Sequence, residues 1–300
     1  MNTFKFVLAL IFVLFSSIFF LTKDTYAHTD HKDIFNQELV TALSLENNSV
    51  TPALICNPTP NQNGTIPKKV KKFRTIYVYN STDEYDKRVS KLKTHVINAD
   101  NILQQNANLY KKNLHFNFEV DQKDCTPIIT KVKATFSELS LVLSEMFGDI
   151  TKQKFLVFIQ SEVDNFDECG VYSGDMLGDT EESGGFAIIY TRCLNERTII
   201  HELFHGLSAV QFSAIDSDFT YHLKNATGDV MSYNLGIKCQ LTSSNVDLFD
   251  DKVLIDCWQR NYLDFSGKKL SVPNIYWNAY LNHDKLIGLD DKIYLSFISN

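Results

Sequence analysis

The sequence lacks a concentrated positive charge. Its 300 residues carry a formal net charge of −7 at pH 7, and the basic run at 68–72 is short. A nucleic-acid partner requires clustered Lys and Arg side chains against the phosphates. We therefore expect no nucleic-acid partner, and we interpret the run at 68–72 as the solvated edge of a domain.

Apolar runs of membrane-spanning length are also missing after the N-terminus. At the N-terminus itself, Lys5 precedes an apolar run at 6–21, and the small residue Ala27 follows at a suitable distance for cleavage. This order is typical of a secretory signal peptide. We expect residues 1–27 to be removed and the protein to be secreted or extracytoplasmic, with no membrane contact afterwards. An uncleaved anchor is the alternative, since the run approaches the shortest length that spans a bilayer.

No two of the cysteines form a C-x-x-C pair, so a zinc site built from thiolates is not expected. An even number of cysteines in an exported chain indicates disulfides. We expect the pairs Cys169–Cys193 and Cys239–Cys257, because each would close a local loop. The six cysteines are Cys56, Cys125, Cys169, Cys193, Cys239 and Cys257.

Regular structure is predicted only after a polar lead-in. Residues 28–70 contain several prolines and little periodicity, which is typical of a linker or pro-segment. Residues 239–300 have a mixed pattern, and we assign them to a smaller C-terminal subdomain after a catalytic domain at 71–238. Hydrophobic periodicity between these segments predicts strands at 74–79, 114–120, 155–159 and 185–190, and helices at 83–112, 134–147 and 196–212.

A glycine-rich acidic stretch lies at 167–185. Its carboxylates could bind Ca²⁺ together with backbone carbonyls. We favour a solvated loop before the strand at 185–190, with calcium as the alternative. The acidic residues concerned are Asp175, Asp179, Glu181 and Glu182.

The predicted helix at 196–212 carries the motif H-E-x-x-H. Asn195 is a suitable N-cap for it, and an apolar stripe follows one of its faces. On a helix, residues four apart lie on the same face, so His201 and His205 can bind one metal ion. Zinc accepts such nitrogen ligands and keeps a further position for water when it is catalytic. Glu202 can then act as a general base toward that water.

A third protein ligand is needed, and two common arrangements are excluded. No glutamate occurs after Glu202, which rules out a downstream glutamate ligand. The compact spacing H-E-x-x-H-x-x-G-x-x-H requires glycine and histidine where this chain has Ser208 and Gln211. The ligands that remain are His222, His283 and several aspartates.

From His201 to Tyr233 the chain resembles the metzincin zinc peptidases, closest to secreted bacterial proteins with a longer spacer after the first motif. The matching stretches are His201-Glu202-Leu203-Phe204-His205-Gly206-Leu207-Ser208-Ala209-Val210-Gln211 and Asp229-Val230-Met231-Ser232-Tyr233.

The resemblance implies roles for residues outside the first motif. Met231 matches the methionine of the turn beneath the zinc, and Tyr233 matches a tyrosine that reaches the metal or the substrate oxyanion. By spacer position the resemblance favours His222 as the third ligand, with Asp229 as its competitor. Asp216 and Asp218 remain further alternatives.

The resemblance also implies an α+β fold with a twisted, mostly parallel sheet of about four or five strands, an active-site helix and a smaller C-terminal part. In the family, the strand matching 185–190 borders the cleft and pairs with extended peptide. The predicted order of elements agrees with this fold.

We therefore expect a secreted, monomeric zinc endopeptidase that binds one catalytic zinc ion and acts on peptides or proteins. Two rivals stay open: a zinc-binding, peptidase-like protein without turnover that has an adhesion or binding role, and a zinc hydrolase with non-peptide substrates. If residues 28–70 form a pro-segment, Cys56 could occupy the open position of the metal, although a disulfide is the simpler fate.

Overall fold

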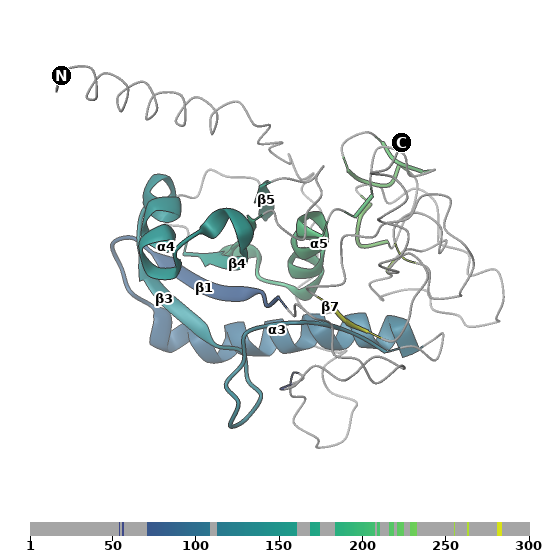
Figure 1. Ribbon diagram of the computed structural model, residues 1–300, viewed down its shortest axis with the longest axis horizontal. Helices are drawn as coiled ribbons and strands as arrows, with labels where there is room; N and C mark the ends of the chain where they lie inside the picture. Colours follow the sequence, from purple (N-terminus) through teal and green to yellow (C-terminus); the bar gives the residue numbers. More distant parts are fainter. Residues whose placement is uncertain are drawn as a thin grey trace, which may run out of the picture.

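The computed structural model describes the central part of the chain most fully (Figure 1). The described residues are 54, 56, 71–108, 113–160, 169–174, 184–207, 209–210, 216–218, 221–224, 229–232, 255, 263 and 281–283. The expected signal segment 1–27 lies outside them. None of the helices within these residues is long and apolar enough to cross a membrane.

A five-stranded sheet forms the centre of the fold. Its spatial order is β3-β1-β4-β6-β5, and every neighbouring pair is parallel except β6 and β5, which are antiparallel. The predicted α+β class with a mostly parallel sheet is therefore confirmed. The strands are β1 (Arg74–Tyr79), β3 (Ile129–Lys133), β4 (Lys154–Ile159), β5 (Gly170–Gly174) and β6 (Gly185–Tyr190).

Helices cover both faces of the sheet. Helices α3 (Tyr85–Asn108) and α5 (Glu196–Gly206) bury side chains in a core on one face, while α4 (Leu139–Phe147) packs in a second core on the other. Figure 1 shows α3 and α4 on opposite sides of the sheet. Alternation along the strands supplies both cores: in β1, Tyr77 belongs to the first, and its neighbours Ile76 and Val78 belong to the second.

Two strands of the five-stranded sheet were not expected from the sequence, and neither was β7 (Leu281–His283). β3 is short and carries alternating lysines, and β5 lies within the glycine-rich stretch at 167–185, so the prediction of a solvated loop there was wrong for residues 170–174. β5 pairs with β6, and its Val171 and Tyr172 side chains are buried in the second and the first core. The acidic residues at 175–183 lie outside the described part.

The expected strand at 114–120 and helix at 196–212 are both shorter in the structure. β2 covers Leu114–Phe116 only, and beyond it Phe118 and Val120 form isolated bridges to Phe73 and Pro127. α5 ends at Gly206, and Val210 has a left-handed φ of 55° that a helix does not allow. The helix therefore stops soon after His205.

Parts of the C-terminal region pack onto the same core as the sheet. β2 pairs antiparallel with β7 (Leu281–His283). The backbone N–H of Ile255 donates to Asn106 Oδ1 of α3 at 3.1 Å, and the side chains of Ile255 and Leu263 are buried in the first core. These described points of 239–300 thus contact the same core as the sheet directly.

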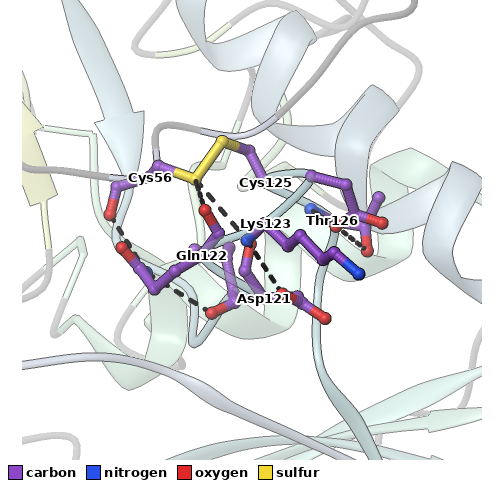
Figure 2. Close-up of a disulfide and its surroundings, with 8 residues drawn as sticks. Cys56, Asp121, Gln122, Lys123, Cys125 and Thr126 are labelled. Atoms are coloured by element: carbon purple, nitrogen blue, oxygen red, sulfur yellow. Dashed lines mark hydrogen bonds between the residues drawn. A yellow bond between two sulfur atoms is a disulfide. The ribbon is translucent and has the colours of Figure 1, made fainter.

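Two disulfides are present among the described residues. Cys56 pairs with Cys125 on the loop after Val120 (Figure 2), and Leu54 beside it is buried and donates its N–H to the Cys125 carbonyl at 3.1 Å. The idea that Cys56 occupies the metal position is therefore wrong. The expected pair Cys169–Cys193 is present, and Cys239–Cys257 lies outside the described residues.

Candidate metal centre

The motif helix α5 begins at a well-formed cap. Asn195 is extended, and its side-chain oxygen accepts the backbone N–H of Thr198 at 2.8 Å. The apolar side of α5 is buried against the sheet through Ile199, Ile200, Leu203 and Phe204. His201 and His205 consequently lie in one row on another face of the helix.

Three histidine rings converge at this face. The Nε2 atom of His205 lies 3.1 Å from Nε2 of His201 and 3.0 Å from Nε2 of His222, and the latter two atoms are 3.2 Å apart. Nitrogens bound at about 2.0–2.1 Å to a tetrahedral ion lie about 3.3–3.4 Å from one another. The three histidines therefore fit a single metal ion.

The ring orientation of His201 supports the same conclusion. Its Nδ1 lies 2.7 Å from the carbonyl oxygen of Val230. A carbonyl oxygen only accepts, so Nδ1 carries the proton, and in the neutral ring Nε2 presents a lone pair. Such a bond to the second nitrogen is the usual support of a metal-binding histidine.

His222 is held by contacts between residues 216–218 and 221–224. The N–H of Asp218 donates to the His222 carbonyl at 2.9 Å, and Asp218 Oδ1 accepts the His222 N–H at 3.2 Å. Tyr221 has a left-handed φ of 65°, a conformation that costs on the order of 1 kcal/mol or more for a bulky residue. The backbone is thus strained at Tyr221, directly before the fully buried His222.

The side chains of Asp229 and Asp218 have other partners in the structure. Asp229 is fully buried, and its Oδ1 accepts the backbone N–H of Met231 at 2.8 Å. Asp218 bonds to the His222 backbone, and the Asp216 carbonyl accepts the N–H of Lys224. Among the described residues, the group whose ligand atoms come together comprises His201, His205 and His222.

Glu202 lies against the first residue of β5. Its side chain is buried, with an exposed fraction of 2 %. A Cβ atom placed on Gly170 would lie 2.8 Å from Glu202 Oε1 and 2.9 Å from its Cγ, so only glycine leaves room for this carboxyl group. The adjacent Cys169 is held by its disulfide and by its carbonyl, which accepts the Tyr190 N–H at 3.0 Å.

A polar contact joins the start of α5 to α3. The carboxylate of Glu196 accepts hydrogen bonds from His95 Nδ1 at 2.9 Å and from Asn98 at 3.1 Å. Burial raises the pKa of Glu196, but these bonds and the His95 charge outweigh it, so the pKa lies below its usual value. The negative charge also suits the positive end of the helix dipole.

Some residues that the sequence singled out cannot be placed. Tyr233, Ser208 and Gln211 lie outside the described residues, and of His283 only the backbone pairing with Leu114 is described. Met231 is fully buried in the first core, in the turn that also contains Val230. Sequence patterns did not indicate Gly170 or Arg197, because both act through backbone contacts that no spacing reveals.

Comparison with known proteins adds little to this description. No family profile and no curated protein matches the sequence. Among solved structures, two crystal structures of OgpA from Akkermansia muciniphila are similar, at 16% identity with a TM-score of 0.30 and at 14% identity with a TM-score of 0.34. The first match covers 48% of this chain and 49% of that chain, and the second covers 64% and 59%. The chain therefore spans about half the length of the first of these structures, and the likeness is too slight to assign it to a family.

Proposed function

We propose that the protein is a secreted, monomeric, metzincin-like zinc endopeptidase. The observation that carries this proposal is the convergence of three histidine Nε2 atoms within 3.2 Å of one another, two of them on the helix that also bears Glu202. Three histidines with an adjacent carboxylate are the donor set and base of a catalytic rather than a structural zinc site.

In this proposal His201, His205 and His222 hold the zinc ion. When bound, the ion supplies Lewis acidity toward the scissile carbonyl and lowers the pKa of water. Glu202 takes the proton from the attacking water and delivers it to the leaving amine. The backbone of Gly170 lies close to the Glu202 carboxyl group and keeps that group beside the helix. Tyr233 would stabilise the substrate oxyanion, as its position after Met231 implies.

Other features support the proposed substrate and compartment. The strand at 185–190, expected to border the cleft and pair with peptide, is β6 and lies between β4 and β5, so that expectation is wrong. Among the described strands β5 is an outer strand of the sheet and starts against Glu202, so an extended peptide could pair with it close to the base. The two disulfides suit an oxidising compartment, which agrees with the apolar N-terminal run expected to act as a signal.

Metal analysis combined with an activity assay tests the proposal. The purified chain should contain about one zinc ion, and it should cleave a mixed peptide library. A chelator should stop this cleavage, and added Zn²⁺ should restore it. A variant with both His201→Ala and His205→Ala is the control that should lack metal and activity. Absence of zinc, with no binding when zinc is added to the chain, would overturn the proposal.

A further inference from the structure

His222 lies in neither α5 nor the sheet, so its position beside His201 and His205 depends on contacts made by its own segment. The segment that follows it makes two contacts with the turn at 229–232, called here the support turn. The N–H of Leu223 donates to the Met231 carbonyl at 2.8 Å, and Ser232 Oγ donates to the Leu223 carbonyl at 3.1 Å. The position of His222 therefore depends on the position of the support turn.

Arg197 joins the support turn to the motif helix. Its Nη2 donates to the carbonyl oxygen of Asp229 at 3.3 Å and to that of Ser232 at 3.2 Å. These are the two ends of the turn, which the Ser232 N–H closes on the Asp229 carbonyl at 3.2 Å. One guanidinium nitrogen thus bridges both ends, and bonds from a charged donor are stronger than neutral ones.

The arrangement follows the repeat of the helix. Arg197, His201 and His205 are four residues apart and share one face of α5. Arg197 contacts the ends of the support turn, His201 contacts its middle at the Val230 carbonyl, and His205 faces His222. The turn therefore lies along the same row of the helix that provides two of the three ligands.

We propose that Arg197 is a positioning residue for the third metal ligand, His222. It fixes the support turn, to which the segment after His222 is hydrogen-bonded. This proposal rests on the proposed zinc site. Arg197 itself touches backbone carbonyls and not the ligand atoms, so its effect reaches the metal through two further contacts. Removing it should leave three histidines present but less well aligned for one ion.

Metal affinity measures this effect without relying on activity. The dissociation constant for Zn²⁺ should be determined by chelator competition, and the visible spectrum of the Co²⁺-loaded protein should report the ligand geometry. Arg197→Ala should weaken metal binding by about 10- to 100-fold, the range found when contacts behind metal ligands are lost, and should alter the Co²⁺ spectrum. Arg197→Lys, which can still reach one carbonyl, should recover part of the affinity.

The matched control is Arg88→Ala, which removes the ion pair between Arg88 of α3 and Glu84 just before that helix and should leave both metal readouts unchanged. Circular dichroism must show each variant to be folded. If Arg197→Ala does not fold, Arg197→Gln replaces it, and the affinities should fall in the order wild type, Lys variant, Gln variant. A folded Ala or Gln variant with wild-type affinity and an unchanged spectrum contradicts the role of Arg197. Failure of the wild-type chain itself to bind metal contradicts the proposed function instead.

Discussion

The two ring nitrogens of His201 face different partners. Nδ1 contacts the Val230 carbonyl, and Nε2 faces the Nε2 atoms of His205 and His222. The first contact selects the tautomer that leaves the second nitrogen able to bind a metal. Glu202, the next residue, projects to a different side of the helix and lies against Gly170. Neighbouring residues of one helical turn are thus available for metal binding and for proton transfer.

Replacement of Glu202 should separate these two tasks. We expect Glu202→Ala to reduce peptide hydrolysis by about 10²- to 10⁴-fold, the usual contribution of a general base, while zinc remains bound. The measurements are the initial rate of hydrolysis and the zinc content of the same sample. Full activity of this variant on an accepted peptide would exclude the mechanism.

His222 and Asp229 can be distinguished by their effects on metal content. We expect His222→Ala to lower zinc content much more than Asp229→Ala, because Nε2 of His222 faces the other two histidines while Asp229 bonds the Met231 N–H. Equilibrium dialysis against limiting zinc gives the comparison. The reverse order of the two variants would transfer the role of third ligand to Asp229.

At the scale of secondary structure, α5 is fixed by its neighbours at both ends. At its start, Glu196 bonds to His95 and Asn98 of α3. At its end, Gly206 leaves room for the ring of Tyr172 in β5, because a Cβ atom added to Gly206 would lie 2.8 Å from that ring. β5 in turn is held by β6 and by the Cys169–Cys193 disulfide. The edge strand and the motif helix therefore form one packed unit around Glu202.

Close packing at the start of β5 predicts the effect of a single methyl group. Gly170→Ala would place that group within 3 Å of the Glu202 side chain and of Thr198 Cγ2, so the carboxyl group must move. We expect kcat to fall at least about tenfold, since proton transfer depends on its position, with zinc content unchanged. Ser173→Ala on the same strand is the control. An unchanged kcat in Gly170→Ala would show that the Glu202 position is not critical.

The Glu196 contact predicts a pH dependence of stability. Because the folded pKa of Glu196 is lowered, the contact stabilises the fold above the unfolded value of about 4.3, and this contribution is lost as the pH falls through the folded pKa. Glu196→Gln should therefore be less stable than the wild type at pH 7 and should approach it as the pH falls through the lowered pKa of Glu196. Urea unfolding across this range measures the difference, and the exposed Glu145→Gln is the control. A constant difference at all pH values would argue against the ionic contact.

At the scale of the whole molecule, described residues of distant segments contact the central sheet and its helices. Leu54 and Cys56 attach the N-terminal lead-in at the loop around Cys125 (Figure 2). Ile255, Leu263 and β7 attach the C-terminal region near α3 and β2. A cut between residues 57 and 70 would consequently leave the lead-in covalently attached.

The Cys56–Cys125 disulfide should contribute strongly to stability. It spans 69 residues, and closing a loop of this length in the unfolded chain corresponds to roughly 4 kcal/mol. We expect the double variant Cys56→Ser, Cys125→Ser to lose a substantial part of this free energy of unfolding, measured by denaturant titration without reductant. Adding reductant should destabilise the wild type more than the variant. Equal stability of the two proteins would mean that the disulfide adds nothing to the fold.

The sequence alone determined those features that depend on local spacing. The four-residue separation of His201 and His205 on a helix, the apolar strands β1, β4 and β6, and the local loop closed by Cys169 and Cys193 all follow from residues close together in the chain. The tertiary structure alone decided which distant groups meet. The partner of Cys56, the strand character of the glycine-rich residues 170–174, and the contacts of Arg197 with the support turn depend on backbone geometry and long-range packing. No periodicity records these features, because each joins segments that are separated in the sequence.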